Sequence, residues 1–226
     1  MAQLQAVLVC GGVGARLRPW SYVIPKPMFP IGERPILELL LNRLRRQGIV
    51  DIHLAVGYKA EVIEAYFGDG SSRGLNLRYI REQSPLGTAG ALAIVRDLVQ
   101  GPVLVMNGDL MTRLDFLAMA AAHQERAAAI TIGTRAYDVP VPYGVVDTDH
   151  GDADTAGRVV ALREKPSFHV RINAGIYMMD RTALDLVPAG RAFDAPDLVS
   201  AAVARGLPVW TYPVSEPWMD IGRLED

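Results

Sequence analysis

The sequence predicts an α/β fold of three layers, in which helices cover both faces of a mostly parallel mixed sheet in the doubly wound arrangement. Short apolar runs alternate through the first half with segments whose apolar residues recur at helical spacing. This alternation is typical of parallel strands joined by crossover helices. Half of the 226 residues are apolar, so the chain can bury the core that such a fold needs.

The elements of the first half follow from these two patterns. Strands are predicted at residues 5–9, 51–56, 77–81 and 102–106, and helices at 35–47, 60–67, 88–98 and 114–124. In the first helix, Pro35 suits the first turn. The stripe expected to be buried there consists of Leu37, Leu40, Leu41 and Leu44, and the side expected to face solvent carries Arg43, Arg45 and Arg46.

The second half changes character, because strand-like runs follow one another with short, turn-rich links. These runs cover residues 128–134, 144–147, 159–164 and 172–179. No repeat, low-complexity segment or linker separates the two halves. We therefore expect one domain over residues 1–226, with one lobe of about 1–125 and a second of about 126–226.

Composition and charge exclude several classes of function. The formal net charge is −2, from 23 basic and 25 acidic residues, so the chain offers no basic field for nucleic acid. Cys10 is the only cysteine, which excludes an intrachain disulfide, and it is expected to be a small core residue. No apolar stretch approaches the ~20 residues that span a bilayer, so we expect no membrane contact and a cytoplasmic location. The four histidines show no metal-ligand spacing.

A glycine-rich loop follows the first predicted strand. Gly11, Gly12 and Gly14 precede Arg16, and Lys26 stands between two prolines shortly afterwards. Glycines allow backbone N–H groups to approach an anion, and fixed cations neutralise phosphate charge, so we expect this loop to bind phosphate groups.

Two better-known phosphate loops do not match. The P-loop is excluded because no Lys-Ser or Lys-Thr follows these glycines. The dinucleotide fingerprint is interrupted because Leu17 stands where its third glycine belongs, which makes an oxidoreductase the minor alternative.

The run from Gly11 to Pro27 resembles the signature of the sugar-1-phosphate nucleotidyltransferases, the enzymes that make nucleotide sugars. Six further segments occur in the family's order, at residues 82–90, 107–109, 143–145, 164–166, 173–175 and 218–222. The resemblance covers nearly the full chain, and seven segments in register make chance a poor explanation. It implies that the lobe of about 1–125 binds the nucleotide and that the lobe of about 126–226 binds the sugar.

The implied reaction transfers a nucleoside monophosphate from a nucleoside triphosphate to a sugar 1-phosphate and releases pyrophosphate. The second pKa of a phosphate monoester lies near ~6, so the acceptor is already ionised at neutral pH and needs no general base. The reaction instead needs positioning and charge neutralisation. The resemblance implies catalysis by Arg16, Lys26 and Asp109, nucleotide binding by Gly11, Gly12, Gly14, Gln83, Gly87 and Thr88, sugar-phosphate binding by Gly144, Glu164, Lys165, Asn173 and Gly175, and Mg²⁺ binding by Asp109 and Asp220.

The identity of the substrates is predicted from one segment. Residues 85–90 look more like those of the mannose-1-phosphate and heptose-1-phosphate guanylyltransferases than those of the thymidylyltransferases. GTP with a mannose-like or heptose-like 1-phosphate is therefore expected. The alternative is a thymidylyl- or uridylyltransferase that acts on glucose 1-phosphate or an amino-sugar 1-phosphate.

An alternative from a different functional class is a protein that keeps the fold but has lost catalysis, and that serves as a nucleotide-sugar sensor or regulatory subunit. The enzyme is favoured over it because the two predicted phosphate-binding cations and the two predicted metal ligands are all present. The chain ends soon after Asp220, so an enzyme of minimal size with a single activity is expected, and homo-oligomerisation is left open.

Overall fold

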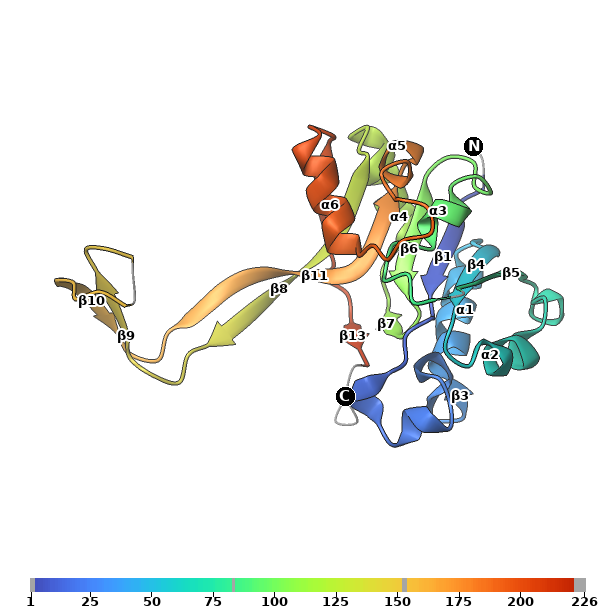
Figure 1. Cartoon of the computed structure of the whole chain (residues 1–226), viewed down its shortest axis with the longest axis horizontal. Helices are drawn as coiled ribbons and strands as arrows, with labels where there is room; N and C mark the ends of the chain where they lie inside the picture. Colours follow the sequence, from blue (N-terminus) through green and yellow to red (C-terminus); the bar gives the residue numbers. More distant parts are fainter. Residues whose placement is uncertain (1–2, 83, 152–153, 222–226) are drawn as a thin grey trace.

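A seven-stranded sheet forms the centre of the molecule in the computed structural model, which describes residues 3–82, 84–151 and 154–221 (Figure 1). Its strands lie in the order β12-β8-β11-β6-β1-β4-β5. Within the described part of the chain, β11 alone runs against the other strands of this sheet. The strands are β1 Gln5–Val9, β4 Asp51–Val56, β5 Asn76–Arg81, β6 Val103–Asn107, β8 Ile130–Pro140, β11 Ser167–Met179 and β12 Val209–Pro213.

Helices cover both faces of the sheet, which confirms the three-layer α/β fold. Alternate strand residues point to opposite faces, so Ala6 and Leu8 of β1 pack with α1, α2 and α4, whereas Val7 packs with α3, α5 and α6. These helices are α1 Ile36–Arg46, α2 Ala60–Phe67, α3 Leu92–Val95, α4 Phe116–Glu125, α5 Arg181–Leu184 and α6 Ala195–Ala204.

Short elements complete the fold at the ends of the strands. Four turns of 3-10 helix occur in the described residues, at η1 Ala15–Leu17, η2 Trp20–Tyr22, η3 Lys26–Met28 and η4 Ser71–Arg73. Three small two-stranded sheets pair β2 Pro30–Ile31 with β3 Arg34–Pro35, β7 Leu110–Thr112 with β13 Trp218–Asp220, and β9 Val145–Thr148 with β10 Val159–Arg163. No helix among the described residues is long and apolar enough to cross a membrane.

Several predicted boundaries need correction. The helix predicted at 88–98 is reduced to α3, because Gly90 packs so closely on the carbonyls of Leu86 and Arg191 that the chain turns there. Pro35 belongs to β3, and α1 begins one residue later. Arg43 is only partly exposed, because its guanidinium donates to the carbonyls of Arg113 at 2.7 Å and Leu114 at 3.2 Å.

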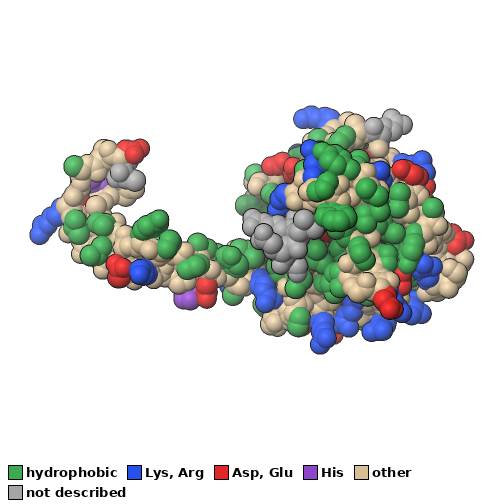
Figure 2. Space-filling model, turned by 90° about the horizontal axis from the view of Figure 1, so that it is seen from below, with side chains coloured by type: hydrophobic (Ala, Val, Ile, Leu, Met, Phe, Trp, Pro, Cys, Tyr) green, Lys and Arg blue, Asp and Glu red, His purple; other side chains and the backbone are tan. Residues whose placement is uncertain are grey.

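Strands β8 and β11 continue beyond the sheet as a two-stranded ribbon that ends in the β9–β10 pair. We call residues 135–172 the arm; it projects from the body of the molecule (Figure 1), and apolar side chains lie along it (Figure 2). Cross-strand pairing places Tyr137 opposite Val170 and Val139 opposite Phe168, all four of them exposed on one face. The arm was predicted only as shorter, separate strands.

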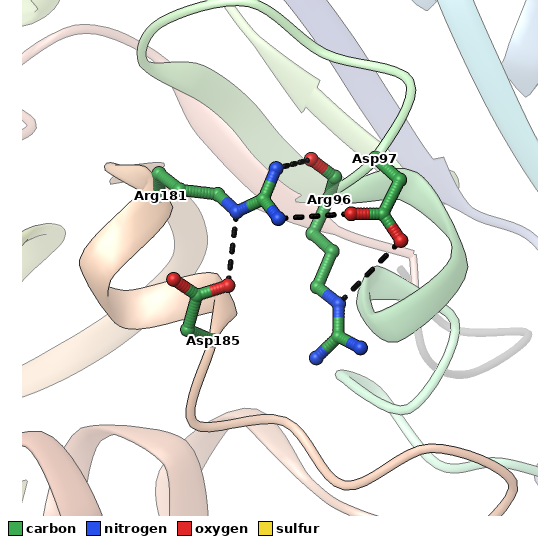
Figure 3. A network of polar contacts seen from close by, with 4 residues as sticks. All are labelled: Arg96, Asp97, Arg181 and Asp185. Atoms are coloured by element: carbon green, nitrogen blue, oxygen red, sulfur yellow. Dashed lines mark hydrogen bonds and ion pairs between the residues drawn. The ribbon is translucent and has the colours of Figure 1, made fainter.

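A surface network joins the segment after α3 to α5 (Figure 3). Arg181 donates to the carbonyl of Arg96 at 2.6 Å, to Asp97 at 2.8 Å and to Asp185 at 2.9 Å. Arg96 lies 3.8 Å from Asp97. Exposed ion pairs contribute about 0–1 kcal/mol each, so the main effect of the network is to fix how α5 lies against this segment.

Candidate active site

The glycine loop begins where β1 ends and leads into η1. Gly14 has a φ of 59°, in the left-handed region that favours glycine, and the chain turns there into the 3-10 helix. A Cβ at Gly12 would meet no atom within 4 Å, so its backbone is open to a ligand. Gly11 is enclosed instead, because a Cβ there would lie 3.2 Å from Glu82 Oε2 and 3.4 Å from the Gly57 nitrogen. Gly11 therefore packs against Glu82 and Gly57, on the side of the loop away from the cavity.

A cavity of about 320 Å³ lies over this loop, at the carboxyl ends of β1 and β6. Ligands of open α/β sheets bind at such ends. The cavity brings together six residues predicted to bind the nucleotide or to act in catalysis: Gly12, Gly14, Arg16, Lys26, Thr88 and Asp109. The site therefore combines open backbone, two cations and one carboxylate in one hollow.

Lys26 forms the electrostatic centre of the cavity, because its ammonium lies between two carboxylates. Nζ contacts Asp109 and lies 3.6 Å from Asp220 Oδ1. The side chains of Lys26 and Asp109 are only 13% and 19% exposed, whereas that of Asp220 is 44% exposed. Strand β13 pairs with β7 and places Asp220 opposite Leu110, which brings it beside Asp109 although the two are distant in sequence.

The two aspartates fit the donor set that Mg²⁺ prefers. Asp109 Oδ1 is buried and has no hydrogen-bond partner, which leaves a carboxylate oxygen free for a cation. Among the residues that the structure describes, no three of His, Cys, Asp and Glu gather to hold a metal by themselves. Magnesium takes few protein carboxylates and completes its coordination with phosphate oxygens and water, so two aspartates suffice where a triphosphate is present.

A second cavity of about 240 Å³ adjoins the first and shares Val9, Thr88 and Asn107 with it. Asn173, Gly175 and Asp220 line it, but none of the described lysines or arginines does. The Asn173 amide is fixed, because it donates to the Tyr177 hydroxyl at 2.6 Å and accepts from the Gly175 N–H at 2.9 Å. Within the described part of the chain, this cavity thus has a rigid polar wall and no cation.

Thr88 lines both cavities and ties the segment 86–90 to the start of α6. Thr88 donates from its backbone N–H and its hydroxyl to Asp194 at 2.8 and 3.1 Å, and its Oγ1 accepts from the Ala195 N–H at 2.8 Å. Gly87 has a φ of 75°, and a Cβ there would lie 2.6 Å from Asp194 Oδ1. Asp194 was not predicted; the signal was an aspartate two residues before Pro196, typical of a helix start. Gln83 lies outside the described residues.

Glu82 was not predicted as a separate site residue, yet it supports the cleft from behind. It follows β5, its Oε2 accepts from the Leu86 N–H at 3.2 Å, and its Oε1 is buried without a partner. Burial raises the pKa of this carboxyl, and the hydrogen bond from Leu86 opposes the rise.

Cys10 is a core residue, as predicted. Burial, together with the charge of Asp109, raises the pKa of its thiol. The thiol therefore stays protonated at neutral pH and is no nucleophile.

Three residues predicted to bind the sugar phosphate are not brought to these cavities. Gly144, Glu164 and Lys165 lie on the arm, whose β9–β10 end stands apart from the body (Figure 1). Within the arm Gly144 and Glu164 are neighbours, because a Cβ at Gly144 would lie 3.1 Å from Glu164 Oε2. Lys165 has a φ of 43°, unusual for a residue with a side chain, at the turn between β10 and β11.

Comparison with known proteins gives consistent relatives over almost the whole chain. The family model described as "Nucleotidyl transferase" matches residues 5–226. Mannose-1-phosphate guanylyltransferase of Mycobacterium tuberculosis is 36% identical over 229 residues, which cover 99% of this chain and 62% of that protein. UTP–glucose-1-phosphate uridylyltransferase of Synechocystis sp. is 33% identical over 242 residues, or 99% of this chain and 61% of that protein. The chain thus spans about three fifths of the length of these relatives.

Solved structures share the fold. HddC from Yersinia pseudotuberculosis superposes with a TM-score of 0.75 at 27% identity, covering 98% of this chain and 95% of that one. The same protein complexed with GMP-PN gives a TM-score of 0.72 at 25% identity and covers the same shares. A putative glucose-1-phosphate thymidylyltransferase from Bacillus anthracis has a TM-score of 0.77 at 22% identity, covering 98% of this chain and 91% of that one, and this likeness concerns the fold alone.

Proposed function

Since the chain belongs to the nucleotidyl transferase family, we propose that it transfers a nucleoside monophosphate from a nucleoside triphosphate to a sugar 1-phosphate and releases pyrophosphate. The observation that carries this proposal is the cavity in which Gly12, Gly14, Arg16, Lys26 and Asp109 meet. Two anionic reactants must approach each other in this reaction, so its site must combine phosphate-binding backbone with fixed cations. The same observation argues against a silent sensor.

The chain's own residues divide the work by their positions. The open backbone at Gly12, together with the turn at Gly14, receives triphosphate oxygens, and Arg16 on η1 neutralises their charge. Lys26 exchanges a carboxylate partner for phosphate oxygens when the triphosphate enters, so its ammonium balances the charge that builds on the leaving pyrophosphate. Asp109 and Asp220 would hold Mg²⁺, which when bound supplies further neutralisation of the triphosphate.

The acceptor side is assigned to the second cavity and to the arm. Asn173 and Gly175 are proposed to border the sugar, and Gly144, Glu164 and Lys165 are proposed to bind it and its phosphate once the arm bends over the cleft. The pairing of β8 with β11 shifts register between Asn173 and Tyr177, and ribbons bend at such bulges.

Two further observations support this closure. Among the residues that the structure describes, no cation lines the second cavity, and Lys165 would supply one. The arm carries an exposed apolar face, and a two-stranded ribbon is at best marginally stable by itself in water. Bending of the arm onto the body would cover this face.

The base is proposed to be guanine and the acceptor a mannose-like or heptose-like 1-phosphate. Relatives at 30–36% identity are named mannose-1-phosphate guanylyltransferases, and HddC is known in complex with GMP-PN. Thr88, which lines the first cavity, is proposed to contact the nucleotide. Gly87 and Gln83 are proposed to do so with it, on the family resemblance. A uridylyltransferase is the second candidate, because a relative of that name is 33% identical.

A matrix of substrates tests the proposal. Pyrophosphate release is measured for GTP, UTP, dTTP, CTP and ATP, each with mannose, heptose and glucose 1-phosphates. We expect kcat/KM for GTP to exceed that for the other triphosphates at least ~10-fold, a difference of about 1.4 kcal/mol. Better use of UTP or dTTP with glucose 1-phosphate would overturn the guanylyl assignment. No pyrophosphate release with any pair would support the silent sensor.

A further inference from the structure

A hollow of about 330 Å³ lies outside the cleft, between α1 and the end of β7. Four arginines line it, Arg34, Arg43, Arg46 and Arg113, together with Asn42 and Thr112, and no acidic residue that the structure describes contributes. The chain as a whole carries a net charge of −2, so this gathering of like charge is local.

The positive charge of the hollow is largely uncompensated. Arg34 meets Glu38 only at 3.7 Å, and that carboxylate also accepts from the Tyr66 hydroxyl. Within the described part of the chain, the guanidinium groups of Arg46 and Arg113 form no hydrogen bond or ion pair. Like charges in a concave site repel one another and attract anions.

Arg43 adds a second and independent observation. Its Nη2 is fixed on the carbonyls of Arg113 and Leu114, so its guanidinium cannot turn away, and its Nε is buried without a partner. Arg43 therefore holds a fixed positive charge in the wall of the hollow.

We infer that this hollow binds a phosphorylated small molecule, as a second anion site separate from the catalytic cleft. Guanidinium groups match phosphate oxygens in pairs, and several of them around one hollow favour a phosphate over a single carboxylate. The volume suits a small organic phosphate.

The hollow is connected to the cleft by one short ladder. Arg113 directly follows β7, and its N–H donates to the Pro217 carbonyl at 3.0 Å, just before β13 begins. The other end of the same β7–β13 ladder carries Asp220 beside Asp109. An anion that joins Arg113 to the arginines of α1 therefore fixes the ladder that positions both aspartates, and it activates the enzyme. This effect rests on the proposed function, whereas the binding itself does not.

Calorimetric titration with inorganic pyrophosphate tests the binding. The cleft is first weakened by Arg16→Ala with Lys26→Ala, and we expect this variant to retain one site. Adding Arg46→Ala with Arg113→Ala should raise the Kd of that site at least ~10-fold, the loss of one strong charged contact. Adding Arg205→Ala, an exposed arginine at the end of α6, should change it less than ~2-fold, because distant surface charges are screened.

The outcomes separate the site from general electrostatics. Equal losses from Arg205→Ala and from the pair in the hollow, or no residual pyrophosphate site in the cleft variant, would overturn the inference. Activity then tests the connection: inorganic phosphate should raise kcat/KM of the wild type several-fold and leave the Arg46→Ala, Arg113→Ala variant unchanged. Binding without activation would refute the coupling alone, and a wild type without any turnover would refute the proposed function instead.

Discussion

Lys26→Ala is the substitution whose effects the cleft geometry defines most sharply. The ammonium contacts Asp109, lies 3.6 Å from Asp220 and is only 13% exposed. Its removal leaves two carboxylates side by side, one of them already holding a buried oxygen without a partner. Two separable effects follow, one on turnover and one on stability.

Turnover should fall at least ~100-fold, equal to about 2.7 kcal/mol, which is typical for the loss of one group that balances transition-state charge. The free energy of unfolding should fall by about 1–3 kcal/mol in the absence of Mg²⁺, because a partly buried carboxylate loses its partner. Mg²⁺ should restore part of this stability, since it replaces the missing positive charge between the same two carboxylates.

Pyrophosphate release and thermal melts with and without magnesium measure the two effects. Lys26→Arg keeps the charge and should melt near the wild type, and Arg205→Ala serves as the control for loss of a surface cation. Near-normal turnover of purified Lys26→Ala would remove Lys26 from the mechanism. Magnesium should raise the melting temperature of Lys26→Ala more than that of the wild type. An equal or smaller rise would refute the idea that Mg²⁺ can replace the Lys26 ammonium between the two aspartates.

Three further predictions address the metal, the arm and the support of the glycine loop. Asp109→Asn should abolish Mg²⁺-dependent turnover while sugar-phosphate binding stays measurable by calorimetry; normal activity at ordinary magnesium concentrations would make Asp109 structural. Lys165→Ala should raise the KM for the sugar 1-phosphate about 10–100-fold and leave the KM for the triphosphate unchanged. If each arm closes over its own cleft, a mixture of Lys165→Ala and Asp109→Asn chains keeps the raised KM of Lys165→Ala, whereas recovery of the wild-type KM would show that arms act on a partner. Glu82→Gln should become more stable relative to the wild type as pH rises above 4.5. The raised pKa of Glu82 means that its carboxyl contributes fully to the stability of the wild type below that pH. The wild type loses this contribution as pH rises through the folded-state pKa, whereas the amide of the variant does not ionise. Urea denaturation at several pH values measures the difference in free energy of unfolding between Glu82→Gln and the wild type. A difference that does not change with pH would argue that burial does not raise the pKa of Glu82.

The sequence predicted those elements whose apolar pattern decides their structure. Strand β1, strand β4 and helix α2 begin and end where the periodicity places them. Tertiary contacts decided the rest. The helix pattern at 88–98 fails because Gly87 and Gly90 pack against the segment that leads into α6, which local spacing does not reveal.

The candidate site was predictable where function lies in one loop, and less so where it depends on distant segments. The convergence of Asp109 and Asp220 followed from the family resemblance. The pairing of Lys26 with both aspartates was not predicted, and the contact of Thr88 with Asp194 had no comparable motif. The position of Lys165 on an extended arm was not predicted, because the motif at residues 164–166 identifies residue types and does not reveal the path of the backbone. The roles of these residues stay predictions until they are tested.

The fate of the acceptor phosphate tests the central claim most directly. Mannose 1-phosphate labelled with oxygen-18 in its phosphate is incubated with GTP, Mg²⁺ and the protein, and the masses of the products are measured by mass spectrometry. Attack by the sugar phosphate on the α-phosphorus predicts that all of the label stays in the nucleotide sugar and that the released pyrophosphate is unlabelled. Labelled inorganic phosphate, or release of GMP or GDP in place of pyrophosphate, would contradict nucleotidyl transfer by this cleft.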